Sequence, residues 1–273
     1  MKKNKSVLMS VPYILWMLVF TLIPLGVMAY YALTDPVTGG FTLKNILNLQ
    51  LFWKSLGVSV GYALISALIC LVLGYPVAYF IAHRSPVTQK ILYMLVMLPM
   101  CMSFLLRTLA WVGILETTGI INTVLGWLHI GPVKMIGTPG AVILGMVYNY
   151  LPYMILPLYA IIVKIDNRLI EAAEDLGCNS VKVFSKVILP LSMPGILSGL
   201  TMVFVPAVST FYISQKLGGA DTLLIGDVIE KQFKTSNNPN MGAALSLLLM
   251  VLVLLCTGIM NRFGSDEEGG VVV

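Results

Sequence analysis

Charge is scarce in this sequence. Asp, Glu, Lys and Arg make up 11% of its 273 residues, whereas they make up about 25% of a typical soluble domain. So few charges cannot cover the water-facing surface of a chain this long, which excludes a soluble enzyme. The hydrophobic content of 58% excludes a disordered protein. The class that remains is an integral membrane protein.

The cysteine and histidine patterns of metal sites are also missing. No two cysteines have the spacing of a metal pair, and the two histidines lie at the ends of apolar stretches: Cys70, Cys101, Cys178, Cys256, His83 and His129. We therefore expect no disulfide framework, no metal and no cofactor. The 17 basic residues are spread over the whole chain, so the net charge of +5 does not indicate nucleic-acid binding.

Motifs that would supply energy or catalysis are absent from the sequence as well. It contains no G-x-x-x-x-G-K-[ST] phosphate loop and no His-Glu-x-x-His. Proton-driven transporters usually need a carboxylate at membrane depth, but Asp35 and Glu116 lie at the ends of apolar stretches and none lies within one. We therefore expect neither an enzyme nor a self-powered transporter. Energy for uphill transport would have to come from another subunit.

Six long apolar stretches are present instead. A helix needs about 20 apolar residues to cross a hydrocarbon core of about 30 Å. The predicted spans are 7–33, 56–82, 91–115, 139–163, 191–215 and 242–262. The third contains Arg107, which we expect to extend toward the outer interface rather than contact solute. The glycine-broken stretch 117–133 is too short to cross and is predicted to be interfacial or re-entrant. The predicted fold class is an all-α polytopic membrane protein with six transmembrane helices.

The distribution of basic residues predicts the topology. With the N-terminus inside, the inner segments carry ten of the 17 Lys and Arg residues and the outer segments carry six, so both termini are expected in the cytoplasm. No convincing cleavage site follows the first apolar run, which predicts an uncleaved first helix. We divide the chain into 1–54, with the first helix and outer loop, a five-helix core at 55–262, and a disordered acidic tail at 263–273.

The longest inner loop, 164–190, has the pattern helix, glycine, helix. Asp166 or Asn167 is suited to cap the first helix, and Gly177 to end it in a left-handed conformation. Asn179 or Ser180 is suited to cap the second helix, and Pro190 is expected to interrupt it where the chain returns to the bilayer. The physical pattern alone fits two alternatives: a helix that docks into a partner protein, or an amphipathic loop that lies on the membrane surface.

The spacing in this loop resembles a known family pattern. EAA at 171–173, three residues, Gly177, nine residues and VILP at 187–190 are similar to E-A-A-x3-G-x9-I-x-L-P, the EAA loop of type I ABC importer permeases. The one departure is Val187 at the Ile position. The resemblance extends over about residues 55–262, and it implies the type I ABC importer permease fold in a bacterial inner membrane.

The resemblance also implies partners and site residues. A helix at 171–177 would seat in a cytosolic ABC ATPase subunit, two of which would drive this chain together with a second homologous permease and an extracytoplasmic solute-binding protein. The residues expected to form the ATPase-coupling loop are Glu171, Ala172, Ala173, Gly177, Leu189 and Pro190.

The solute is indicated less specifically. LVLGYP at 71–76, LPLSMPGI at 189–196 and FYIS at 211–214 resemble the permease subunits of spermidine/putrescine importers. Permeases for ferric iron, thiamine, phosphonate or opines share parts of these stretches. The alternatives are therefore a permease of the same family for one of those solutes, or a channel or facilitator without an ATPase.

A candidate solute path begins in the fourth span, where uncharged oxygen acceptors and aromatic faces suit an organic ammonium. Its members, with two residues from the fifth span, are Tyr148, Asn149, Tyr150, Tyr153, Ser209 and Tyr212. The alternative for each of these residues is packing between helices.

Overall fold

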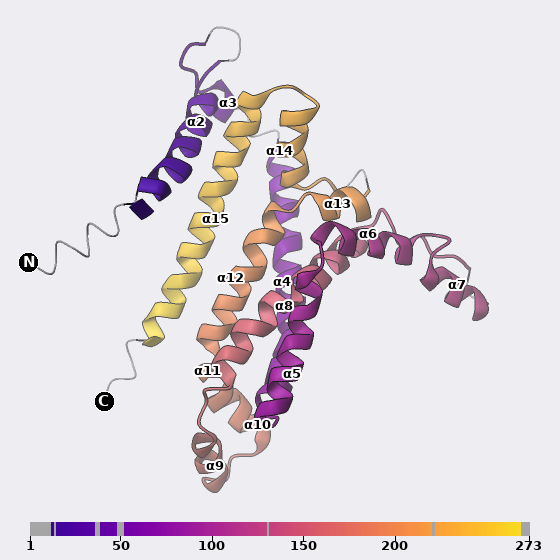
Figure 1. Ribbon diagram of the computed structural model, residues 1–273, viewed down its shortest axis with the longest axis vertical. Coiled ribbons are helices and arrows are strands. Elements are labelled where there is room, and N and C mark those ends of the chain that lie inside the picture. Colours follow the sequence, from indigo (N-terminus) through magenta and orange to yellow (C-terminus); the bar gives the residue numbers. More distant parts are fainter. Residues whose placement is uncertain are drawn as a thin grey trace, which may run out of the picture. The chain divides into compact units, whose positions relative to one another are not determined.

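The computed structural model describes residues 12–13, 15–35, 39–47, 52–129, 131–219 and 222–268, in which the regular elements are helices (Figure 1). An isolated antiparallel bridge pairs Thr34 with Phe41. The chain divides into two units, Met1–Trp53 with Val228–Leu252, and Lys54–Asp227 with Val253–Val273.

The first unit contains a π-helical turn, η1 (Leu18–Leu22), followed by α2 (Ile23–Ala32) and α3 (Lys44–Leu47). It also contains most of α14 (Ile225–Lys234) and the first half of α15 (Pro239–Glu268). The second unit contains α4 (Trp53–Ala82), α5 (Pro86–Met97), η3 (Leu98–Cys101), α6 (Phe104–Leu115), α7 (Ile120–Trp127), α8 (Pro139–Ile162), α9 (Asn167–Asp175), α10 (Ser180–Val183), η4 (Phe184–Ile188), α11 (Leu189–Leu191), α12 (Met193–Ser209) and α13 (Tyr212–Leu217).

Two buried amides close the C-terminal end of α2. The Asn240 side chain donates to the carbonyl oxygens of Tyr31 (2.9 Å) and Thr34 (2.6 Å). The Asn45 side chain donates to those of Ala32 and Thr34, both at 3.1 Å. The last carbonyls of a helix have no donor within the helix. These amides therefore donate hydrogen bonds to carbonyl groups for which lipid has no donor. They fasten α3 and the start of α15 to the end of α2.

Helices α4, α8 and α12 form the core of the second unit. Glycines let their backbones approach closely: a Cβ on Gly199 of α12 would lie 2.6 Å from the Met154 sulfur and 3.3 Å from the Met154 carbonyl oxygen of α8. A Cβ on Gly74 of α4 would lie 3.1 Å from Met154 Cγ. Met146, Met154 and Leu158 of α8 are fully buried at this junction. Small residues at such contacts are typical of helix packing in membranes, where dispersion rather than water expulsion holds helices together.

The prediction of one continuous helix over 91–115 is wrong. The chain forms α5 and η3, then adopts an extended conformation at Met102, and α6 turns away from α5 (Figure 1). Pro99 explains the break, because it has no N–H for the carbonyl one turn earlier. The predicted span 191–215 is interrupted in the same way. Helix α12, which contains Pro206, ends at Ser209, Thr210 is extended, and α13 follows.

The described residues contain five helices long and apolar enough to cross a membrane, or six if a bent pair of helices is counted as one. They are Leu15–Ala32, Trp53–Ala82, Phe104–Trp127, Pro139–Ile162 and Pro239–Met260, with Ser180–Leu191 and Met193–Ser209 as the bent pair. The polytopic all-α prediction is confirmed. The third crossing candidate includes α7, which lies in the stretch predicted as interfacial or re-entrant, while Pro86–Cys101 is a shorter apolar helix.

The last helix extends further than the sequence predicts. The backbone of α15 is helical to Glu268, six residues past the predicted end at 262. Residues 269–273 of the predicted disordered tail, and residues 7–11 and 14 of the first predicted span, lie outside the described part of the chain.

The close approach of α12 to α8 gives a test of the core. We expect Gly199→Leu to lower the thermal midpoint of the detergent-purified protein, because overpacking at such a contact costs about 1–3 kcal/mol. Gly61→Leu in α4 is the matched control, since a Cβ at Gly61 meets nothing within 4 Å. Equal midpoints for the two variants, measured by loss of helical circular dichroism, would contradict this packing.

Candidate functional site

The loop 164–190 is built by local capping. Asp166 accepts a hydrogen bond from the Arg168 N–H (3.0 Å) at the start of α9, and Asn179 accepts one from the Lys182 N–H (3.0 Å) at the start of α10. Side-chain oxygens at these positions satisfy the free N–H groups of a first helical turn. Of the two capping candidates predicted for each helix, the structure selects Asp166 and Asn179.

Gly177 makes the turn between α9 and α10. Its φ is +80°, in the left-handed region that favours glycine. The Gly177 N–H donates to the Glu174 carbonyl (2.8 Å) and the Cys178 N–H donates to the Ala173 carbonyl (3.1 Å). This pair of bonds is the Schellman arrangement, which ends a helix and satisfies its last carbonyls. The predicted conformation of Gly177 is confirmed.

Helix α9 presents its surface outward. All nine of its residues are at least partly exposed, with Glu171 and Ala172 exposed and Ala173 half-buried. Beyond it, Leu176 is 86% exposed, and Val181 on α10 is 73% exposed. Apolar side chains exposed together on a charged helical hairpin fit both alternatives predicted for this loop, docking into a partner protein or lying on the membrane surface. In the second unit this hairpin extends past the ends of α8 and α12 (Figure 1).

The return of the loop to the core differs from the prediction at Pro190. The Leu189 N–H donates to the Phe184 carbonyl, five residues back, which makes η4 a π-helical turn. Pro190 lies in the first turn of α11, where its missing N–H is tolerated. The axis bends by 64° at Ser192, between α11 and α12, two residues after the predicted interruption.

Two of the predicted path residues are packed inside the chain. Asn149 is 1% exposed and donates to the Gly145 carbonyl (2.9 Å) of its own helix. Tyr150 is also buried, and its hydroxyl donates to the Pro206 carbonyl of α12 (3.3 Å). Tyr150 therefore joins α8 to the last turn of α12. For these two residues the structure favours the packing alternative.

Tyr148 and Tyr212, two members of the predicted path, lie near α6. Tyr148 is 38% exposed and meets Trp111 of α6 edge-on, with ring centroids 5.3 Å apart. Tyr212 of α13 lies 6.3 Å from Phe104 of α6, centroid to centroid. Phe104 and Trp111 are seven residues apart, which places them on one face of α6. That spacing is a signal that sequence reasoning missed.

The two remaining path residues, Ser209 and Tyr153, interact within their own helices. The exposed Ser209 hydroxyl donates to the Val205 carbonyl (3.2 Å) of its own helix. Tyr153 is half-buried, with its ring 6.3 Å from that of Tyr150.

Arg107 lies on the same face of α6, and the prediction that it extends to the interface is wrong. It is 6% exposed, and its Nε and Nη1 have no hydrogen-bond partner among the described residues. Its surroundings come from packing of α6 against α8 and α13, which the linear sequence does not display. The guanidinium is therefore enclosed by this chain rather than extended into water.

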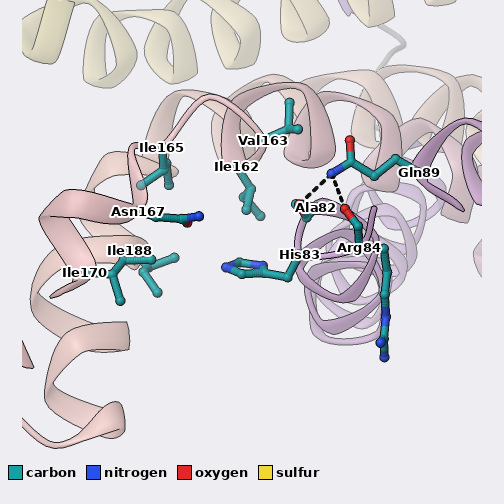
Figure 2. Close-up of a pocket in the computed structure, with 10 residues that line it drawn as sticks. All are labelled: Ala82, His83, Arg84, Gln89, Ile162, Val163, Ile165, Asn167, Ile170 and Ile188. Atoms are coloured by element: carbon teal, nitrogen blue, oxygen red, sulfur yellow. Dashed lines mark hydrogen bonds between the residues drawn. The ribbon is translucent and has the colours of Figure 1, made fainter. Parts of the chain in front are cut away.

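A polar pocket of about 290 Å³ lies at the base of the loop 164–190. Figure 2 shows His83 pointing into it and Arg84 pointing away. Gln89 spans the junction beside it: its amide nitrogen donates to the carbonyls of Ala82 (2.9 Å) and Arg84 (2.8 Å), and its amide oxygen accepts from the Tyr159 hydroxyl (3.2 Å). The turn between α4 and α5 is thereby tied to α8, from which α9 follows.

Comparisons with known proteins agree with this architecture. The family described as "Binding-protein-dependent transport system inner membrane component" matches residues 71–266. The chain is 42% identical over 253 residues to the spermidine/putrescine transport system permease protein PotB of Haemophilus influenzae, covering 88% of this chain and 87% of that protein. It is 42% identical over 217 residues to PotB of Escherichia coli strain K12, covering 78% and 79%.

A solved structure shows the same fold. A bacterial ABC transporter involved in the import of the acidic polysaccharide alginate superposes with a TM-score of 0.81 at 18% identity, over 97% of this chain and 96% of that one. The family predicted from the EAA spacing and the fold that it implies are both confirmed. The matched residues 71–266 include α8, the loop 164–190 and α12, and the chain belongs to the family of binding-protein-dependent transport system inner membrane components.

Proposed function

We propose that this chain is the membrane-spanning permease subunit of a bacterial ABC importer for the polyamines spermidine and putrescine. It works with two cytosolic ATPase subunits, a second homologous permease and an extracytoplasmic solute-binding protein. Both termini and the loop 164–190 lie in the cytoplasm. The chain supplies the path, and the ATPase subunits supply the energy, because its sequence has no phosphate-binding loop.

The loop 164–190 carries the proposal for coupling. It combines an exposed apolar surface at Leu176 and Val181 with a turn fixed by the Schellman bonds of Gly177. A rigid exposed hairpin of this kind is able to transmit the motion of a partner without deforming. Glu171, Ala172 and Ala173 form the contact surface in this proposal, and Leu189 and Pro190 carry the displacement back to α12.

The identity to permeases named for spermidine and putrescine supports the cargo, and the chemistry near α6 is compatible with it. The exposed ring of Tyr148 and the half-buried ring of Tyr212 offer faces to an organic ammonium. The Lys216 ammonium already lies over the Tyr212 ring, 5.8 Å from its centroid. We place the solute path along Tyr148, Tyr153, Ser209 and Tyr212, with Asn149 and Tyr150 supporting the helices behind it.

Uptake of labelled spermidine tests the cargo. In a host strain that lacks this chain and has no other polyamine importer, we expect ATP-dependent spermidine uptake to be lost, and a plasmid copy to restore it. Unchanged uptake in that strain would contradict the proposed cargo and point to another solute of the family.

Substitution of Gly177 tests the coupling loop. Gly177→Val places a β-branched residue at φ +80°, where a left-handed conformation costs about 1–2 kcal/mol, and we expect uptake to fall about fivefold or more. Gly177→Asn is the matched control, because Asn adopts this conformation readily and should retain most uptake. Both variants should insert in the membrane in normal amounts. Equal uptake by the Val variant and the wild type would remove the basis for the coupling role.

A further inference from the structure

A buried serine hydroxyl makes hydrogen bonds at the bend between the loop 164–190 and the core. Ser192 lies at the 64° bend and is fully buried. Its Oγ donates to the Leu189 carbonyl at 2.9 Å, in the turn just before the bend. The Ser192 N–H also donates to the Ile188 carbonyl (2.9 Å). One residue thus holds the last turn of the incoming segment 180–191.

Tyr75 of α4 binds this hydroxyl from the core side. Its Oη lies 2.8 Å from Ser192 Oγ. A serine hydroxyl has a single proton, and that of Ser192 is given to Leu189, so the Tyr75 hydroxyl is the donor. Hydrogen bonds therefore run from α4 through Ser192 to the turn before the bend.

The ring of Tyr75 contacts the incoming segment a second time. It packs edge-on against Phe184, with centroids 5.4 Å apart and planes at 82°. Phe184 begins the π-helical turn η4, and Ser192 follows α11. A single side chain from α4 therefore holds the segment between loop and core at both of its ends.

Tyr75 is itself held in place by the packing of α4. A Cβ on the preceding residue, Gly74, would lie 3.1 Å from Met154 Cγ and 3.3 Å from Ile155 Cγ1 of α8. Helix α4 therefore lies directly against α8 at this level, and Tyr75 itself is buried. Because Tyr75 is held in this way, a displacement of segment 180–191 is passed to α4 through its contacts with Ser192 and Phe184.

We propose that Tyr75 and Ser192 are positioning residues that transmit movement of the loop 164–190 to the core helices α4, α8 and α12. This inference rests on the proposed coupling function of the loop. Without the Tyr75–Ser192 hydrogen bond, segment 180–191 turns about the bend while α4 stays in place. ATP hydrolysis then continues with less solute carried per cycle.

The test compares transport with hydrolysis in the complete complex. This chain, its partner permease, the ATPase subunits and the spermidine-loaded binding protein are reconstituted in liposomes, and spermidine uptake and ATP hydrolysis are measured together. Tyr75→Phe keeps the ring against Phe184 and removes only the hydroxyl. Since a hydrogen bond contributes about 1 kcal/mol, we expect about a fivefold fall in spermidine carried per ATP. Ser192→Ala should produce a similar fall, and the double variant should show no further loss.

Tyr79→Phe is the matched control, one turn further along α4, where the hydroxyl makes no hydrogen bond to any residue that the structure describes. This variant should carry as much spermidine per ATP hydrolysed as the wild type. If Tyr75→Phe and Ser192→Ala both carried the wild-type amount of spermidine per ATP, the inference would be overturned, even if the rates of uptake and hydrolysis fell together. If Tyr75→Phe does not assemble, Ser192→Ala decides alone. Absence of ATP-dependent spermidine uptake by the wild-type complex would instead refute the proposed function.

Discussion

A chain with so little charge must satisfy its polar backbone internally, because lipid offers no hydrogen bonds. Every helix break in such a chain creates free carbonyl groups, and here buried polar side chains lie at the breaks. Asn45 and Asn240 bind the carbonyls at the end of α2. Tyr150 binds the Pro206 carbonyl near the end of α12, and Ser192 binds the Leu189 carbonyl at the bend. At these three breaks the side chains pair carbonyl groups that lipid would leave without a donor.

The same constraint shapes how motion can pass through the molecule. Glycine contacts hold α12 and α4 against α8, so these helices have little freedom to slide. The loop 164–190 has the opposite character, since α9 is exposed and held by its own capping bonds. The two parts meet at a few side chains, among them Tyr75, Ser192 and Gln89. The proposed function requires this arrangement, in which an exposed loop is joined to a close-packed core by specific hydrogen bonds.

Local chemistry was predictable from the sequence, whereas side-chain surroundings were not. Preferences of single residues predicted the left-handed Gly177 and narrowed each cap to two neighbouring residues, of which the structure selects Asp166 and Asn179. Apolar length predicted an all-α membrane fold, but length says nothing about Pro99, whose missing N–H ends a span early. The burial of Arg107 and Asn149 depends on how α6, α8 and α13 pack together. The contact between Ser192 and Tyr75 could not be predicted for the same reason, because the two residues lie 117 positions apart in the sequence.

The central claim is that the loop 164–190 meets a cytosolic ATPase. Site-directed cross-linking in native membranes tests this claim most directly, in a chain whose Cys70, Cys101, Cys178 and Cys256 have been replaced. A cysteine introduced by Leu176→Cys, at a position 86% exposed, is predicted to cross-link to the ATPase subunit, while Trp127→Cys, at an exposed position on α7, is predicted not to. Failure of the Leu176→Cys variant to cross-link in a complex that still transports, or its labelling by an impermeant reagent from outside the cell, would contradict the account.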